Sequence, residues 1–261
     1  MRLKFSSAFA AILLSSLAAV SALAQQPAPK TTTAGASVTV ATQPSTMTAT
    51  VAITPATSPT DLARASLVAL GGDKYRNMKS MWLSGSVELF APNSAQSLPG
   101  KFALVTAGER YRRDIQSPAF VFQQIYDGQQ NYSSVPQFDF PPPSLYGLSV
   151  LNKFDRPGYT VTALPDNKKQ RAFRITGPEN NSTDFYIDAA TARIVSYSFN
   201  YNGLTFATEF KSFKEVDGVL LPFSFVEKLD TPRGSFYADS KVKEAKVNQT
   251  VTDDVFAIPT K

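Results

Sequence analysis

Any chemistry in this chain must come from carboxylates, lysines, tyrosines and serines, because its 261 residues include no histidine and no cysteine. These two absences exclude Cys/His zinc sites, disulfide bonds, thiolate nucleophiles, and catalysis of the Ser-His or Cys-His type. One nucleophile motif is present, because Ser240-Lys241-Val242-Lys243 matches a Ser-x-x-Lys string. It lies in a strand-like stretch, where residues three apart point to opposite faces of a sheet. We therefore assign Ser240 no catalytic role.

Paired carboxylates are the remaining route to catalysis, as in glycoside hydrolysis. Glu88, Glu109, Asp114 and Glu209 lie on or beside expected strands, but their spacing does not pair them. The sequence contains no phosphate-binding loop, no Gly-x-Ser-x-Gly elbow and no EF-hand pattern. We predict a non-catalytic binding protein that uses no cofactor and no metal, with a carboxylate-dependent hydrolase as an alternative.

Apolar residues at alternate positions indicate a second kind of chemistry, the binding of an acyl chain. Burying such a chain contributes about 0.8 kcal/mol per CH₂, and aromatic side chains cover large areas with few rotors to freeze. The same residues would also fill a dry core between a sheet and a helix, and this alternative stays open. The predicted inward set is Phe102, Leu104, Phe122, Phe173, Ile175, Phe185, Ile187, Phe206, Phe210, Phe223 and Phe225.

Three arginines lie close together, at Arg110, Arg112 and Arg113. Arginine binds phosphates and carboxylates bidentately, so these residues are candidate contacts for a lipid headgroup. Their alternative interpretation is charge on a solvent-exposed strand. Elsewhere no Lys/Arg cluster interleaves with aromatics, so nucleic acid is not a predicted partner.

The first residues have the pattern of a targeting segment and not of a folded domain. Arg2 and Lys4 precede an apolar run from Phe5 to Val20, and Ala22-Leu23-Ala24 is a small-x-small cleavage site. This pattern predicts a secretory signal peptide over residues 1–24, cleaved after Ala24. Residues 25–60 are rich in Thr, Ala and Pro, with one charge and no aromatic, which predicts a disordered linker. Residues 61–261 are the predicted folded domain.

The folded domain should begin with a helix and continue as a sheet. Ser58-Pro59-Thr60-Asp61 is a helix start, and Gly71-Gly72 a helix end. After Trp82 the apolar period changes to two, and Asn202-Gly203 is a strong hairpin signal. About ten strands joined by short turns predict an antiparallel sheet or barrel. The expected strands span 82–89, 101–106, 120–126, 159–163, 172–176, 185–187, 193–201, 204–213, 219–229 and 234–247.

One insert interrupts the strands. Residues 137–143 end in three prolines, and residues 144–154 have leucines spaced for a short amphipathic helix. An irregular insert of this kind is suited to a lid over a cavity. A surface loop packed by its own leucines explains the same pattern.

Four stretches together resemble the LolA/LolB superfamily, the outer-membrane lipoprotein-sorting protein-like group. Their order and spacing span most of residues 61–261. They are Ala69-Leu70-Gly71-Gly72 leading through Met78-Lys79-Ser80 to Trp82-Leu83-Ser84-Gly85; Gly100-Lys101-Phe102-Ala103-Leu104-Val105 with Gly108-Glu109-Arg110-Tyr111-Arg112-Arg113-Asp114; Ile125-Tyr126-Asp127-Gly128-Gln129-Gln130-Asn131-Tyr132; and Val216-Asp217-Gly218-Val219-Leu220-Leu221-Pro222 with Phe256-Ala257-Ile258-Pro259.

This resemblance implies a mostly β (α+β) fold, a curved and incompletely closed antiparallel β-barrel with covering helices. It implies a periplasmic monomer that holds a lipid or lipoprotein acyl group in an apolar cavity, in lipoprotein sorting to the outer membrane. Membrane-bound donor and acceptor proteins are the implied partners.

Two features differ from the superfamily pattern. The carriers proper have an Arg-Pro pair after the second strand, where this chain has Thr106-Ala107, and the anchored acceptor has a lipidated cysteine. A remaining alternative is an envelope sensor that binds a protein regulator, which requires a partner-binding domain besides the barrel.

Overall fold

The computed structural model describes residues 53–136, 139–167 and 169–259. The chain divides into Met1–Met47 and Thr48–Lys261, and all described residues belong to the second unit. The predicted signal peptide, and the predicted linker as far as residue 52, lie outside the described residues. Within the described residues, no helix has the length and apolar character that a membrane span requires.

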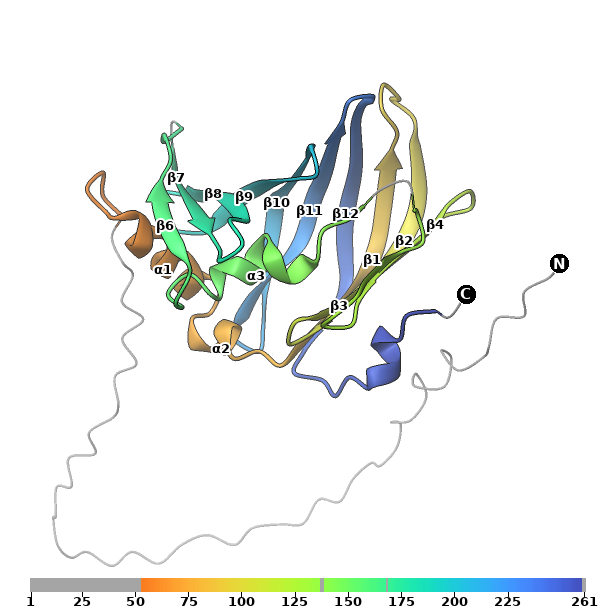
Figure 1. Cartoon of the computed structure of the whole chain (residues 1–261), viewed down its shortest axis with the longest axis horizontal. Coiled ribbons are helices and arrows are strands. Elements are labelled where there is room, and N and C mark those ends of the chain that lie inside the picture. The colour runs from red at the N-terminus through yellow and green to blue at the C-terminus, as the bar shows by residue number, and fades with distance from the viewer. Residues whose placement is uncertain (1–52, 137–138, 168, 260–261) are drawn as a thin grey trace, which may run out of the picture. The chain divides into compact units, whose positions relative to one another are not determined.

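The described strands form one 12-stranded sheet in the order β5-β4-β3-β2-β1-β12-β11-β10-β9-β8-β7-β6. Neighbouring strands are antiparallel throughout, and β5 and β6 are open edges (Figure 1). The predicted mostly β, incompletely closed antiparallel fold is therefore confirmed. The strands are β1 (Ser80–Phe90), β2 (Ser97–Ala107), β3 (Arg110–Gln116), β4 (Val121–Tyr126), β5 (Asn131–Ser133), β6 (Thr160–Ala163), β7 (Gln170–Thr176), β8 (Ser182–Asp188), β9 (Ile194–Tyr201), β10 (Leu204–Val216), β11 (Val219–Thr231) and β12 (Gly234–Val247).

The sheet curves strongly, so that β6–β9 face β1–β4 across a concave side (Figure 1). Two bulges help it to bend. The pairing of β1 with β12 shifts between Ser84 and Gly85, and that of β10 with β11 shifts around Ser212. A Cβ on Gly85 would collide with the Lys241 carbonyl oxygen, so only glycine permits this approach. Bulges of this kind increase local twist and bend a strand.

A strap, residues 139–159, runs between the two edge strands and crosses the concave side (Figure 1). It contains a short 3₁₀ turn, η2 (Pro143–Leu145), and one turn of helix, α3 (Leu148–Leu151). The helix expected over residues 144–154 is thus shorter than predicted. Gly147 separates the two pieces because its φ of +59° lies outside the helical region.

Helix α1 (Pro59–Ala69) covers the β6–β7 end of the sheet. Ser58 caps it as expected, because its hydroxyl accepts from the Asp61 amide at 3.1 Å. Helix α2 (Asp73–Arg76) follows directly. The buried face of α1 packs into the main core, which is the largest cluster of buried apolar residues in the domain.

A smaller cluster lies on the convex face. There Val105 and Ile125 pack with Phe256 of η3 (Asp253–Phe256), a 3₁₀ turn near the C-terminus. The Arg110 guanidinium lies over the Phe256 ring, 4.7 Å from its centroid. The sheet therefore buries apolar side chains on both faces, and the concave side holds the larger set.

Candidate functional site

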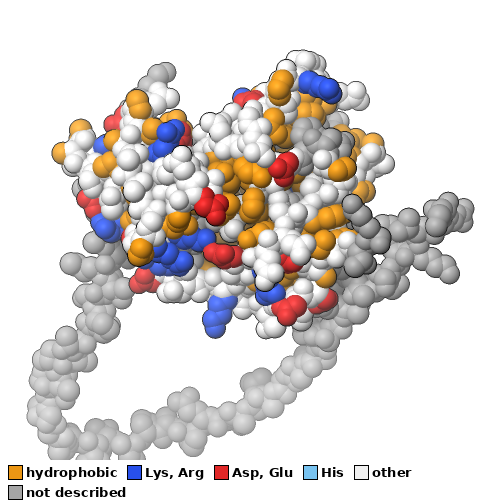
Figure 2. All heavy atoms as spheres, in the orientation of Figure 1, with side chains coloured by type: hydrophobic (Ala, Val, Ile, Leu, Met, Phe, Trp, Pro, Cys, Tyr) orange, Lys and Arg blue, Asp and Glu red, His pale blue; other side chains and the backbone are white. Residues whose placement is uncertain are grey.

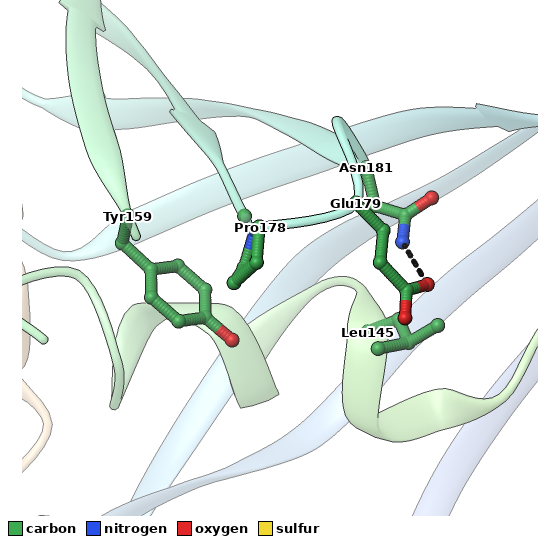
Figure 3. A pocket seen from close by; sticks show the side chains of 6 residues that line it. Leu145, Tyr159, Pro178, Glu179 and Asn181 are labelled. Carbon is green, nitrogen blue, oxygen red and sulfur yellow. Dashed lines mark hydrogen bonds between the residues drawn. The ribbon is translucent and has the colours of Figure 1, made fainter. Parts of the chain in front are cut away.

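A cavity of about 910 Å³ lies between the concave face and the strap. Its volume falls within the range of small-molecule sites, which is about 300–1,000 Å³. Hydrophobic side chains gather in this hollow between the two sides of the sheet (Figure 2). A second hollow, of about 110 Å³, lies near the β7–β8 turn beside Tyr159, Glu179 and Asn181 (Figure 3). Its small volume makes the large cavity the candidate site.

Cross-strand rows of residues build the wall of the cavity. Phe206 pairs with Phe199 on one side and with Leu229 on the other. The Phe199 and Phe206 rings stack at 5.1 Å between centroids. Four residues along β10, Phe210 pairs with Phe225 and forms a second apolar row. Side chains at alternate positions share a face, so both rows point into the cavity.

The strap adds aromatic rings from the opposite side. Tyr146 stacks on Phe199 with 4.3 Å between ring centroids. Phe140 lies 5.0 Å from Phe122 and 6.1 Å from Phe206, measured between centroids. The strap therefore connects β4 with β9 and β10 through ring contacts and covers the cavity between them.

Hydrogen bonds fix the strap at both sides of the sheet. Gln124 of β4 donates to the Pro141 carbonyl at 3.1 Å. The Tyr146 hydroxyl bonds to Asn181 at 2.7 Å, and the Gly147 amide donates to Thr183 at 3.1 Å. These bonds satisfy polar groups that the strap would otherwise bury without partners.

Ion pairs hold the far end of the strap. Lys153 pairs with Glu109 of the β2–β3 turn at 2.6 Å, and Asp155 pairs with Arg76 at 2.9 Å. Both pairs are partly exposed, so each contributes modestly to stability. Glu109, one of the carboxylates considered for catalysis, is thus engaged in holding the strap.

A polar row lies between the two apolar rows. Thr208 of β10 pairs with Tyr197 of β9 and with Glu227 of β11. Glu227 accepts from Arg113 of β3 at 2.6 Å and through a second, shorter bond, so the pair is bidentate. The Arg113 and Glu227 side chains are only 13% and 26% exposed. An ion pair therefore crosses the concave face inside a mainly apolar cavity.

The pKa values of Arg113, Tyr197 and Tyr111 are set by burial and by the charges of the Arg113–Glu227 pair. Burial alone would lower the pKa of Arg113, but the Glu227 carboxylate, together with the Tyr111 and Tyr197 phenols, outweighs burial and raises it. Burial raises the pKa of Tyr197 to about 12 and also raises that of Tyr111, although Arg113 acts in the opposite direction on both. At neutral pH the Arg113 guanidinium is therefore charged, and both phenols are protonated hydrogen-bonding groups.

The structure brings five of the predicted inward residues to the cavity wall: Leu104, Phe122, Phe206, Phe210 and Phe225. Phe102 is buried in the main core beside this wall, with its ring 6.0 Å from that of Phe225. Phe223 lies at the edge of the core beneath Lys214, whose amine is 4.6 Å from the ring centroid.

The other four predicted residues lie together at the β7–β8 end of the sheet. Phe173, Ile175, Phe185 and Ile187 are each 0% exposed, within the main core that also includes α1. The Phe173 and Phe185 rings stack at 5.2 Å. These four side chains fill core in the described structure.

The three arginines divide between the two faces of β3. Arg113 points into the cavity and is engaged by Glu227. Arg110 pairs with Asp253 at 2.5 Å, and Arg112 pairs with Asp114 at 2.7 Å. Those two contacts lie on the convex side, beside η3.

Several cavity residues are absent from the predicted set. Tyr197 and Phe199 alternate along β9, so strand periodicity contained a signal for them. Phe140 and Tyr146 lie in the strap, outside the strand alternation and outside the leucine spacing of residues 144–154. Glu227 is a charge on an otherwise apolar strand face, and only its contact with Arg113 explains it.

Among the described residues, no group of three or more Asp or Glu side chains is arranged to hold a metal ion. Asp114 accepts from Arg112 and from Gln123 at 2.8 Å. The cavity is therefore mainly apolar, and its wall contains the Arg113–Glu227 ion pair.

No protein-family model matches this sequence, and no curated protein sequence is significantly similar to it. Its fold is similar to that of a DUF1329 family protein from Desulfovibrio piger, with a TM-score of 0.51 and 10% identity over 77% of this chain and 98% of that one. At this identity the similarity concerns the fold alone.

Two further solved structures are similar in fold. A LolA superfamily protein from Nitrosomonas europaea has a TM-score of 0.48 and 10% identity over 78% of this chain and 99% of that one. An outer membrane lipoprotein-sorting protein domain from Vibrio parahaemolyticus has a TM-score of 0.46 and 11% identity over 74% and 97%. The described strands of this chain thus form an open antiparallel sheet around an apolar interior, with a fold similar to that of the DUF1329 family protein.

Proposed function

We propose that this protein is a non-catalytic carrier that holds an acyl chain of a lipid or lipidated protein in the cavity beneath the strap. The observation that carries the proposal is the 910 Å³ cavity walled by the rows of Phe199, Phe206 and Leu229 and of Phe210 and Phe225. Each buried CH₂ contributes about 0.8 kcal/mol, so a chain with several buried methylenes binds usefully and reversibly.

The proposed ligand contacts are the cavity-facing members of the predicted set, together with Phe140, Tyr146 and Phe199. The proposed setting is the periplasm, after cleavage of a signal peptide following Ala24, with residues 61–261 as the carrier domain. Lipoprotein sorting to the outer membrane, with membrane-bound donor and acceptor proteins, is the process that fits this ligand and setting.

The test is ligand binding by the exported protein. Native mass spectrometry and lipid extraction should detect a bound lipid, and the purified protein should bind a fluorescent fatty-acyl probe. The cavity-filling variant Ala238→Trp should weaken probe binding about tenfold or more, because Ala238 lines the cavity beside Glu227. The matched control is Ala190→Trp, at an exposed turn position outside the cavity lining. Protein without lipid that also fails to bind the probe would overturn the proposal.

A further inference from the structure

An acyl chain by itself would have no use for the polar row of Tyr197, Thr208 and Glu227. Tyr197, Thr208 and Glu227 occupy adjacent positions on β9, β10 and β11, between two apolar rows of the same wall. A polar row in an apolar wall costs desolvation energy unless its groups find partners. Arg113 supplies a partner for Glu227 from the other side of the cavity.

The charges of this cluster already compensate each other. Two Arg113 nitrogens engage both Glu227 oxygens, and Arg113 also hydrogen-bonds Tyr111. Lys228 is the other charged residue among the described residues of the lining, and it pairs with Asp230 at 2.8 Å. A ligand carboxylate or phosphate entering here would displace Glu227 from Arg113 or lie beside it, and either outcome leaves an anion poorly compensated in a low-dielectric site.

Phenol and threonine hydroxyls remain as neutral hydrogen-bonding groups. Tyr197 and Tyr111 both line the cavity. Tyr197 also lies against the strap, because a Cβ on Gly147 would be 2.9 Å from its ring. An uncharged polar group on a ligand can therefore hydrogen-bond at the strap side of the cavity while its chain lies along the aromatic rows.

We propose that Tyr197, Tyr111 and the Arg113–Glu227 pair select acyl ligands whose polar group is uncharged, such as an ester or a hydroxyl, over ligands that carry a carboxylate or phosphate at that position. This inference rests on the proposed function, because it assigns a ligand class to the same cavity.

The test compares two ligands that share one acyl chain, monopalmitoylglycerol and palmitate. Each competes with the neutral fluorophore N-phenylnaphthylamine at about pH 8, where the palmitate carboxyl is ionised, and below the aggregation concentration of either ligand. Monopalmitoylglycerol should displace the fluorophore from the wild-type protein at concentrations about tenfold lower than palmitate.

Three variants and one control variant test the assigned residues. Glu227→Gln frees the Arg113 charge and should raise palmitate affinity about tenfold, whereas Glu215→Gln, at an exposed position of β10, should leave both affinities unchanged. Tyr197→Phe should weaken monopalmitoylglycerol binding about fivefold, and by more than it weakens palmitate binding. The double variant Arg113→Met with Glu227→Met should lose the discrimination, and it decides the outcome if Glu227→Gln does not fold.

The possible results separate the two proposals. A wild-type protein that binds neither the fluorophore nor either ligand would overturn the proposed function. A protein that binds the fluorophore but takes palmitate as tightly as monopalmitoylglycerol would overturn this inference and leave the carrier function standing. Unchanged selectivity in both Glu227→Gln and the double variant would also overturn the inference.

Discussion

Arg113 and Glu227 form a bidentate ion pair across the concave face, although β2, β1 and β12 separate their strands in the sheet. The pair exists because the sheet curves enough for β3 to face β11. Among the described residues, neither Arg113 nor Glu227 forms an ion pair with a residue of an adjacent strand. The contact therefore ties the two sides of the half-barrel together.

Breaking this pair from one side should cost more than replacing both residues. Arg113→Met or Glu227→Met alone leaves a charge in the cavity wall without its partner, and we expect a loss of about 2–4 kcal/mol in the free energy of unfolding. The double variant should be closer to the wild type than the sum of the two single losses. Urea unfolding of all four proteins measures the coupling, and additive single effects would contradict it.

Gly147→Ala should displace the strap. The new Cβ would lie 2.9 Å from the Tyr197 ring, and φ at this position is +59°. The matched control is Gly108→Ala, where φ is +61° and a Cβ would have no neighbouring atom within 4 Å. We expect Gly108→Ala to cost about 1 kcal/mol from its positive φ. We expect Gly147→Ala to cost about 1–3 kcal/mol more, because of the clash and because its ψ of −141° lies outside the left-handed region. Equal losses in urea unfolding of the two variants would contradict this prediction.

Phe185 lies in the core and Phe206 in the cavity wall, so substitutions at these two positions should have different effects. Phe185 is 0% exposed, so Phe185→Ala should lower the free energy of unfolding by about 3–5 kcal/mol. Phe206 lines the cavity and is half-buried, so Phe206→Ala should cost about 1–2 kcal/mol while weakening binding of an acyl probe. Denaturant unfolding and probe titration, run on both variants, check this division. Greater loss of binding in folded Phe185→Ala than in Phe206→Ala would reverse the assignment.

Tyr197 should make stability fall at alkaline pH. Its folded pKa is raised to about 12, chiefly by burial, from an ordinary value of 10.0. Its contribution to stability is therefore fully present below pH 10.0 and is lost as the pH rises through about 12. Tyr197→Phe should retain more of its stability over that range than the wild type does. Phenolate absorbance and circular dichroism followed against pH measure both effects, and parallel curves for the two proteins would contradict this assignment.

Local patterns in the sequence determined much of the architecture. Ser58 and Pro59 begin α1, and Asn202-Gly203 connects β9 to β10, because caps and tight turns depend on residues that are neighbours in the chain. Alternation located most of the long strands. It did not mark β3, because the inward positions Tyr111, Arg113 and Ile115 include a charge whose partner is distant in sequence.

Periodicity also indicated that Phe173, Phe185, Phe206 and Phe225 point to one face of the sheet. It did not distinguish the pair that packs in the core with α1 from the pair that faces the cavity. That difference depends on the curvature of the sheet and on where the strap crosses it. The sequence by itself therefore determined the element types and the apolar faces, which follow from contacts between near neighbours. The tertiary structure alone decided the cavity, the strap contacts and the Arg113–Glu227 pair, because these join segments that only the curved sheet brings together.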